Sequence, residues 1–368
     1  MTRSAASRAS GPLRIAVIGF GAIAEMHVRA LAELRDRVEL VAYSGGSPAR
    51  AAELLRDAGW QDAVRSEPLA IIDDDDIDLV LIAAPSGVHG SLALAALRRG
   101  KHVVVEKPMA IDVHEAETID LLARRSGLVV SVISQRRFEP EHAYVKQLLA
   151  DGLLGEVVLA TTQVPWYRDD AYFAAAPWRS QIASGGGSLM NQGVHNVDLL
   201  EWLCGPVQSV TAQSVVRPRS GDTDATMVAT VRFGSGAVGT IVTTTEAFPG
   251  DSATVSIFTT KGQVVLGQGE VLRWDVDAPP PPSGAPVGHG GSDPLAIGHV
   301  GHLRQWRDVV DAVDSGRAPA IGSSDGLRTV RLLCGIHEAA RTGRRVDLLP
   351  APAGARATAP DRETGTSR

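Results

Sequence analysis

Residues 13–24 read LRIAVIGFGAIA, an apolar run followed at once by a glycine-rich turn and the start of a helical segment. The run LRIAVI has the length and composition of a buried strand. Gly19, Gly21 and Ala24 occupy the three small-residue positions of a G-x-G-x-x-A fingerprint, in which the turn is tight and the backbone can approach a pyrophosphate. The stretch therefore predicts a strand, turn and helix that bind a dinucleotide. The residues expected to contact it are Gly19, Phe20, Gly21, Ala22 and Ile23.

Apolar runs alternate with helical segments from this stretch to about residue 134. The further runs are VELVAY (38–43), DLVLIAAP (78–85), KHVVVEKP (101–108) and GLVVSVIS (127–134). The segments with helical spacing are AEMHVRALAELRD (24–36), SPARAAELLRDAG (47–59), HGSLALAALRRG (89–100) and HEAETIDLLARRSG (114–127). Five strands that alternate with helices predict a doubly wound parallel sheet. We expect a dinucleotide-binding Rossmann domain over residues 12–136.

The pattern changes after about Phe138, because strand-like segments follow one another with only turn signals between them. These segments are VQSVTAQSVV (207–216), ATMVATVRF (225–233), AVGTIVTTTEA (237–247) and ATVSIFTT (253–260). Consecutive strands predict an α+β domain with a large, mostly antiparallel open sheet, over residues 137–348. Helical segments at 299–316 and 325–343 complete this domain.

Three segments lack the patterns of regular structure. Residues 277–293, DAPPPPSGAPVGHGGSD, are rich in proline and glycine, and we expect a long loop that is either mobile or acts as a lid. Residues 1–11 and 349–368 have the composition of disordered tails.

Composition excludes several function classes. The 368 residues are 44% apolar and carry a net charge of −6, without a basic block that would favour nucleic acid or a membrane surface. No apolar run has membrane-spanning length. Cys204 and Cys334 are the only cysteines and lie far apart, so neither a disulfide framework nor a metal site is indicated. The acidic run at residues 73–76 is interpreted as a solvated loop. We expect a cytoplasmic protein without a bound metal.

The end of the second apolar run lacks the acidic residue that usually binds the ribose 2′-hydroxyl of NAD. The chain continues there as Ser44-Gly45-Gly46-Ser47. Ser44 and Ser47 are suited to hydrogen-bond a 2′-phosphate, and Arg50 is suited to pair with it. NADP is therefore favoured slightly over NAD, and both remain open.

Lys107 lies in the motif Glu106-Lys107-Pro108, which ends an apolar run at the edge of the sheet where a nicotinamide would lie. An ammonium there can bind a substrate oxygen and stabilise developing negative charge. The alternative is a surface lysine without a role in catalysis.

A second group follows the glycine run at residues 185–187. Asn191, His195 and Asp198 are spaced i, i+4 and i+7, so on a helix they would share one face. A neutral imidazole can accept a hydroxyl proton near neutral pH, which makes His195 the candidate base for oxidation and acid for reduction. A histidine that only packs is the alternative.

These motifs, together with Ala84-Pro85-Ser86-Gly87-Val88-His89, resemble the Gfo/Idh/MocA family of glucose–fructose oxidoreductases and inositol dehydrogenases. The resemblance runs from about residue 12 to 348. It implies an NAD(P)-dependent oxidoreductase that acts on a hydroxyl-bearing carbon of a sugar or polyol, in a homodimer or homotetramer. The further cofactor contacts that it implies are Ala84, Pro85, His89, Glu106 and Lys107.

The resemblance also implies that Lys107 and His195 are catalytic. The family usually has aspartate at the position of Asn191. Because an amide cannot hold a negative charge, we expect Asn191 to orient the substrate by hydrogen bonding.

Much of the chain's scarce aromatic content lies at residues 166–179. Aromatic faces stack on the C–H face of a sugar, and arginines offer forked donors to hydroxyl, carboxylate or phosphate groups. The expected substrate contacts are Lys107, Arg168, Trp178, Arg179, Asn191 and His195. A structural core or a dimer contact is the alternative for each aromatic residue. Residues 298–305, Arg136 and Arg137 are further candidates near the cleft.

Two other functions remain open from the sequence. One is a dinucleotide-binding sensor or scaffold without turnover, because a fold does not fix a function. The other is an enzyme that uses tightly bound NAD(P) for non-redox glycoside chemistry.

Overall fold

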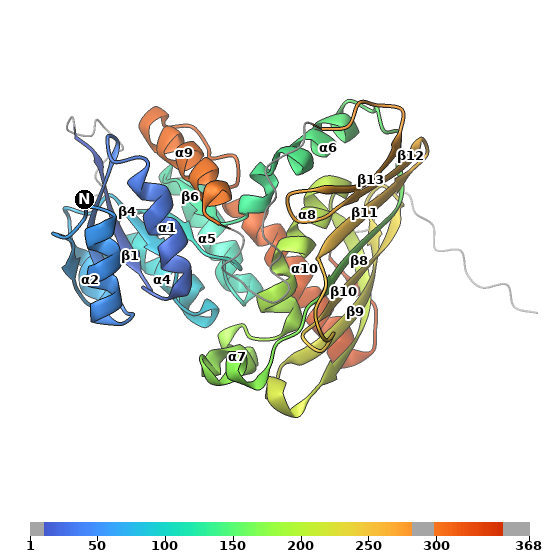
Figure 1. Cartoon of the computed structure of the whole chain (residues 1–368), viewed down its shortest axis with the longest axis horizontal. Helices are drawn as coiled ribbons and strands as arrows, with labels where there is room; N and C mark the ends of the chain where they lie inside the picture. The colour runs from blue at the N-terminus through green and yellow to red at the C-terminus, as the bar shows by residue number, and fades with distance from the viewer. Residues whose placement is uncertain (1–10, 282–297, 349–368) are drawn as a thin grey trace, which may run out of the picture.

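A computed structural model describes residues 11–281 and 298–348, and it contains two β-sheets (Figure 1). The expected tails at 1–10 and 349–368, and residues 282–293 of the expected loop, lie outside the described residues. None of the helices in the described part of the chain is long and apolar enough to cross a bilayer.

The first sheet has six parallel strands in the order β3-β2-β1-β4-β5-β6. They are β1 (Leu13–Ile18), β2 (Val38–Ser44), β3 (Val64–Arg65), β4 (Leu79–Ile82), β5 (His102–Val105) and β6 (Val130–Val132). The order reverses between β1 and β4, and this is where such sheets open a crevice for ligands at the carboxyl ends of the strands. The predicted doubly wound sheet is confirmed, with one strand more than expected.

Helices pack on both faces of this sheet, which is why its central strands are apolar throughout. The helices that connect its strands are α1 (Ala22–Ala32), α2 (Pro48–Asp57), α3 (Pro68–Asp73), α4 (His89–Arg98) and α5 (Val113–Ser126). All four residues of β4 are fully buried. A sixth helix, α9 (Val300–Ser315), returns from the C-terminal part of the chain. Its Trp306, Val309 and Val310 join the core formed by β1 and α1.

The second sheet has eight strands in the order β13-β12-β11-β7-β10-β9-β8-β14. They are β7 (Val157–Pro165), β8 (Val207–Val216), β9 (Asp224–Phe233), β10 (Val238–Thr244), β11 (Thr254–Thr259), β12 (Gly262–Leu266), β13 (Val271–Val276) and β14 (Val346–Asp347). Only β7 and β10 pair in parallel, so the predicted, mostly antiparallel sheet is confirmed.

One face of the second sheet is covered by α6 (Pro140–Ala150), α8 (Val194–Cys204) and α10 (Ser323–Thr342) (Figure 1). Its strands alternate between buried and exposed side chains, as in β9, where Met227, Ala229 and Val231 face the helices. This alternation is typical of a sheet with one covered face.

Several elements were not predicted from the sequence. The strand β3 has only two residues, too few for a pattern, and α3 ends at Asp73, so the acidic run begins in a helix before its exposed turn. Helix α6 and strands β7, β12, β13 and β14 were also missed. The short α7 (Asp170–Ala174) lies between the two sheets in Figure 1.

Candidate active site

The fingerprint turn requires glycine at position 19. Gly19 has a φ of +98°, and a Cβ built on it would lie 2.3 Å from the backbone nitrogen of Ala84. Its N–H donates to the backbone oxygen of Ser44 at 3.0 Å. Gly19 therefore joins the ends of β1, β2 and β4 at the carboxyl edge of the sheet.

Gly21 has a different environment, because a Cβ built there would meet no atom within 4 Å. It precedes the first turn of α1, which no side chain caps. Ala22 and Ile23 follow at the same, partly exposed turn. The unpaired N–H groups and the positive end of the helix dipole fit a pyrophosphate. Phe20 is buried against Tyr43 with ring centroids 4.9 Å apart, so it supports the turn from the core.

The loop after β2 contains two glycines with positive φ, followed by the exposed Ser47 at the N-terminus of α2. Ser44 is buried at the end of the strand. Arg50 already has a partner, because its Nη2 lies 3.0 Å from Oε2 of Glu25 on α1. Glu25 also pairs with Arg29 at 2.7 Å. The one cation predicted for a 2′-phosphate is thus shared with a carboxylate.

Glu106 is buried in a network behind the sheet edge. Its Oε1 accepts from Nε2 of His27 at 3.0 Å, and its Oε2 accepts the Lys107 backbone N–H at 3.1 Å. Nδ1 of His27 accepts from the indole N–H of Trp306 at 3.0 Å, which fixes the imidazole tautomer because indole can only donate. Although burial opposes ionisation, His27 and His302 hold the pKa of Glu106 well below its ordinary value.

The group formed by His27, Glu106 and His302 is close enough to hold a metal ion, but its hydrogen bonds do not fit one. A metal-bound histidine normally donates from its second ring nitrogen, whereas that nitrogen of His27 accepts from Trp306. A second group, Glu139, Glu141 and His142, lies beside the Arg136 guanidinium, 3.5 Å from Glu139. Neither arrangement favours a cation.

His89 links two loops of the sheet edge. It is 1% exposed, and its two ring nitrogens lie 2.8 Å from the Pro108 oxygen and 2.7 Å from the Ala84 oxygen. Burial lowers its pKa, although the two carbonyls favour the cation. Because both nitrogens face backbone, His89 holds Ala84, Pro85 and the Lys107–Pro108 segment together from behind.

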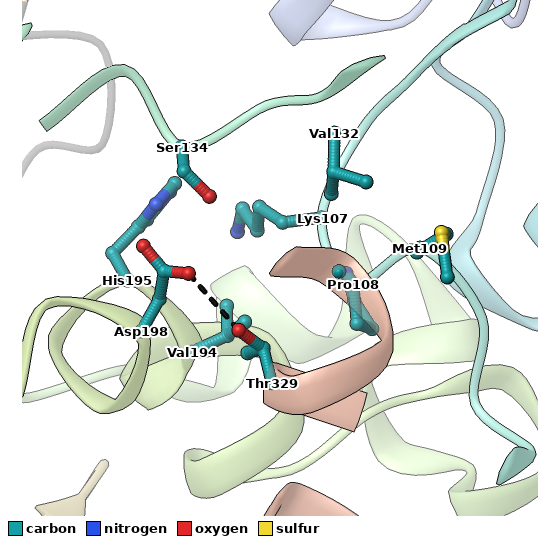
Figure 2. Close-up of a pocket in the computed structure, with 10 residues that line it drawn as sticks. Lys107, Pro108, Met109, Val132, Ser134, Val194, His195, Asp198 and Thr329 are labelled. Carbon is teal, nitrogen blue, oxygen red and sulfur yellow. Dashed lines mark hydrogen bonds between the residues drawn. The ribbon is translucent and has the colours of Figure 1, made fainter. Parts of the chain in front are cut away.

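Lys107 and His195 line one pocket, which they enter from different elements: Lys107 from the loop after β5 and His195 from α8 (Figure 2). Nζ of Lys107 donates to the backbone oxygen of Asn191 at 3.0 Å. Burial lowers the pKa of Lys107, against the opposing effect of Glu106. Burial, and next the Lys107 charge, hold the pKa of His195 well below its ordinary value of 6.5, so its imidazole is neutral at pH 7.

Asp198 lines the same pocket, but the protein itself satisfies its carboxylate (Figure 2). Arg137 donates to it twice, at 2.8 and 2.6 Å, and the Thr329 hydroxyl donates at 2.9 Å. Asn191 lies in a π-helical turn, Ser188–Gly193, before α8 begins at Val194. The three residues therefore do not lie on a single α-helix, because Asn191 precedes α8, whereas His195 and Asp198 lie within it.

The remaining candidates, Arg136 after β6 and residues 298–305, make contacts within the protein. Arg136 is buried and donates to Asn196 Oδ1 at 2.6 Å and to the Gly267 oxygen at 2.9 Å. In segment 298–305, Gln305 is buried and donates to the Val132 oxygen at 2.7 Å. His302 faces Glu106 at 3.8 Å from behind.

The aromatic and arginine candidates gather around Tyr172 of α7. The Arg179 guanidinium carbon lies 4.0 Å from the centre of its ring, and that of Arg168 lies 5.3 Å away. Trp178 is partly exposed on the next turn. The structure joins this group to Asn191 through Gln192, whose amide contacts both Arg168 and Tyr172. Gln192 was not predicted from the sequence, because no spacing rule distinguishes it from other polar residues.

Comparisons with known proteins give two family matches. A model of the oxidoreductase family with an NAD-binding Rossmann fold matches residues 13–134, and the GFO/IDH/MocA C-terminal domain matches residues 142–265. Together they match more than half of the chain.

Three similar proteins illustrate the relationship. Myo-inositol 2-dehydrogenase of Thermotoga maritima is 25% identical over 87% of this chain and 94% of its own length. The uncharacterized oxidoreductase YdgJ of Escherichia coli is 33% identical, over 58% of this chain and only 60% of its own length. The crystal structure of the WlbA dehydrogenase from Bordetella pertussis, in complex with NADH and UDP-GlcNAcA, is 29% identical. It has a TM-score of 0.81 and covers 93% of this chain and 100% of that one.

The fingerprint turn, the parallel sheet and the two family matches lead to one conclusion and confirm the resemblance seen in the motifs. The chain belongs to the Gfo/Idh/MocA family of oxidoreductases, with an NAD-binding Rossmann fold.

Proposed function

We propose that the protein is an NAD(P)-dependent dehydrogenase or reductase that acts on a CH–OH carbon of a sugar, polyol or sugar derivative. The observation that carries this proposal is the pair Lys107 and His195, which line one pocket at the carboxyl edge of the parallel sheet. The similarity to a myo-inositol dehydrogenase and to a dehydrogenase that binds UDP-GlcNAcA supports the substrate class. When bound, the nicotinamide supplies the donor or acceptor of the hydride.

The residues of the pocket divide the remaining work. The Lys107 ammonium binds the reacting oxygen and stabilises the negative charge that develops on it. His195, neutral at pH 7, takes the hydroxyl proton in oxidation and returns it in reduction. Asn191 orients the substrate, because its amide nitrogen is held by Tyr172 at 3.1 Å while its oxygen is left for a substrate hydroxyl.

The residues of the sheet edge would hold the cofactor. Gly21, Ala22 and Ile23 border the open N-terminus of α1, which suits the pyrophosphate. The contacts from the other loops are Ala84, Pro85 and Lys107. Phe20, His89 and Glu106 act from behind, because all three are buried.

For the 2′-position we favour NADP over NAD. The Ser47 hydroxyl makes no capping hydrogen bond to α2 and is exposed. Arg50 would exchange Glu25 for a 2′-phosphate, and the Glu25 carboxylate opposes that exchange. The preference is therefore expected to be small.

We also propose that residues 12–136 are the cofactor domain and residues 137–348 the substrate domain, with the substrate between them. We also propose a cytoplasmic location. The second sheet supports a homodimer or homotetramer. In the described ranges no helix covers its outer face, where Val228, Val238, Val242 and Phe258 are at least partly exposed. Apolar surface of this kind is typically buried between subunits.

A cofactor reduction screen tests the proposed function. The purified full chain is mixed with NAD or NADP and a panel of sugars, inositols, glycosides and sugar nucleotides, and nicotinamide absorbance is followed. We expect turnover with at least one compound, and its loss in His195→Asn with unchanged nucleotide affinity. No turnover with any compound, with nucleotide binding intact, would favour a dinucleotide-binding sensor, or an enzyme that uses tightly bound NAD(P) for non-redox chemistry.

A further inference from the structure

Tyr172 lies at the end of a chain of hydrogen bonds with a fixed direction. Oε1 of Gln192 accepts from Nε and Nη2 of Arg168 at 3.2 and 3.0 Å. A guanidinium has only donors, so it fixes which end of the Gln192 amide faces it. The amide nitrogen is therefore turned to Tyr172 and donates to the phenol oxygen at 2.5 Å.

A second amide donates to the same phenol oxygen, since Nδ2 of Asn191 lies 3.1 Å from it. A phenol oxygen has two lone pairs and one proton. Two amide N–H groups and the Arg168 guanidinium face the lone pairs of the Tyr172 oxygen, so its own O–H points elsewhere. No residue in the described ranges accepts this proton.

Arg179 adds a second donor without an acceptor. Its Nη1 donates to the Tyr172 backbone oxygen at 2.7 Å, which places the guanidinium against the ring. Its Nε is buried and finds no acceptor among the residues that the structure describes.

The carboxylates of α7 do not fill these donors. Asp169 accepts the Tyr172 backbone N–H at 2.8 Å and caps the helix. Asp170 is 90% exposed and faces Arg219 at 3.9 Å. Neither carboxylate therefore accepts from the Tyr172 hydroxyl or from Nε of Arg179.

We propose that Tyr172 and Arg179 form a subsite for an anionic substituent, a carboxylate or a phosphate, of the carbohydrate substrate. Asn191 places this subsite next to the reacting carbon, because its backbone oxygen binds Lys107 while its amide binds Tyr172. A charged acceptor suits the Tyr172 O–H and Nε of Arg179, because both donors would otherwise lack an acceptor. The inference rests on the proposed function and narrows its substrates to sugar acids or sugar phosphates.

The test measures ligand binding and does not depend on turnover. The full chain, saturated with NAD or NADP, is titrated calorimetrically with D-glucuronate, D-galacturonate and glucose 6-phosphate, and with glucose and galactose as neutral partners. We expect at least one anion to bind about tenfold or more tightly than its neutral partner, since hydrogen bonds to charged groups are the strong ones. Comparing uronates with the phosphate shows which anion the subsite takes.

Two variants locate the binding. Tyr172→Phe keeps the ring and removes the donor, and Arg179→Gln removes the charge. Each is expected to weaken the preferred anion about tenfold and thereby to lower the ratio of its affinity to that of the neutral partner. Tyr144→Phe, on α6, is the matched control. It also removes a tyrosine hydroxyl, but this hydroxyl donates to the Pro279 oxygen at 3.0 Å and is not part of the proposed subsite. Thermal melts check that all three variants fold.

Equal affinity for anionic and neutral sugars, no binding of any anion in the panel, or equal weakening of both classes by Tyr172→Phe would overturn the subsite. Turnover of a neutral sugar, without tighter binding of any anion in the panel, would keep the proposed function and reject this inference. Anion binding that depends on Tyr172, without turnover of any compound, would keep the anion subsite and reject the proposed function.

Discussion

Two layers of polar groups meet at the carboxyl edge of the six-stranded sheet, and they differ in what satisfies them. In the inner layer the protein itself supplies partners, as for Glu106 with His27 and Asp198 with Arg137. In the outer layer Lys107 and His195 line a pocket, and Tyr172 has a donor left over. Residues adjacent in sequence, such as Glu106 and Lys107, fall in different layers. A buried polar group with all its hydrogen-bond partners stabilises the fold, whereas a polar group that lacks a partner is available to a ligand.

The largest expected effect is in the outer layer. His195→Asn removes the proton acceptor and keeps a polar side chain of similar shape, so we expect kcat to fall about 10³-fold, within the usual range for a general base. Nucleotide affinity and the melting temperature should stay the same. If the variant retains most of the wild-type kcat, His195 is not the general base.

The inner layer should respond in stability and not in chemistry. Arg137→Leu leaves the Asp198 carboxylate buried without its main partner, which is expected to lower the free energy of unfolding by about 3 kcal/mol. Denaturant unfolding measures the change, and kcat per folded molecule should be close to wild type. An unchanged unfolding midpoint would show that solvent reaches Asp198.

The two glycines of the fingerprint sharpen the same contrast within one turn. Gly19→Ala forces a Cβ to within 2.3 Å of backbone at a positive φ, so it should destabilise the fold by about 1–3 kcal/mol. Gly21→Ala meets no protein atom within 4 Å and should leave stability unchanged, while nucleotide binding weakens about tenfold, or about 1.4 kcal/mol. Thermal melts with and without nucleotide separate the two. Equal loss of stability in both variants would contradict the open helix terminus.

The pH dependence of stability follows from the lowered pKa of His195. Because its folded pKa lies below 6.5, its neutral form contributes stability that is fully present above pH 6.5 and is lost as pH falls through the folded pKa. His27 and His89 also have lowered pKa values, so the comparison must be with His195→Asn. The stability of wild type relative to this variant should decline as the pH falls below 6.5. A constant difference from pH 8 to pH 5 would mean that His195 titrates normally.

The smallest effect is expected at the residues proposed to lie near the ribose 2′-position of the cofactor. Arg50→Ala removes one cation that is shared with Glu25, so NADP affinity should fall by only about two- to fivefold and NAD affinity should not change. Titration of the two nucleotides, monitored by protein fluorescence, measures the ratio. Glu25→Gln is the complementary variant and should raise NADP affinity. A loss of NAD binding in Arg50→Ala would show that Arg50 has a structural role.

The parts of the site that sequence analysis found were those with local signals. Gly19 and Gly21 follow a strand directly, Lys107 ends another, and His195 follows a glycine run in motifs that resemble one family. Gln192 and Glu25 carry no such signal, because their importance comes from Arg168 and Arg50, which lie 24 and 25 residues away. The strand β3 was missed because two residues cannot show a period.

By itself, the sequence determined the doubly wound sheet, the open second sheet, the dinucleotide turn and the catalytic candidates. It could do so because hydrophobic periodicity and small residues at a turn act over a few residues of the chain. Only the tertiary structure decided which polar groups the protein satisfies and which it leaves open. Those partners come from distant elements, as when Trp306 of α9 fixes the tautomer of His27 on α1. Hydrogen-bond direction depends on the whole network, and no local pattern records it.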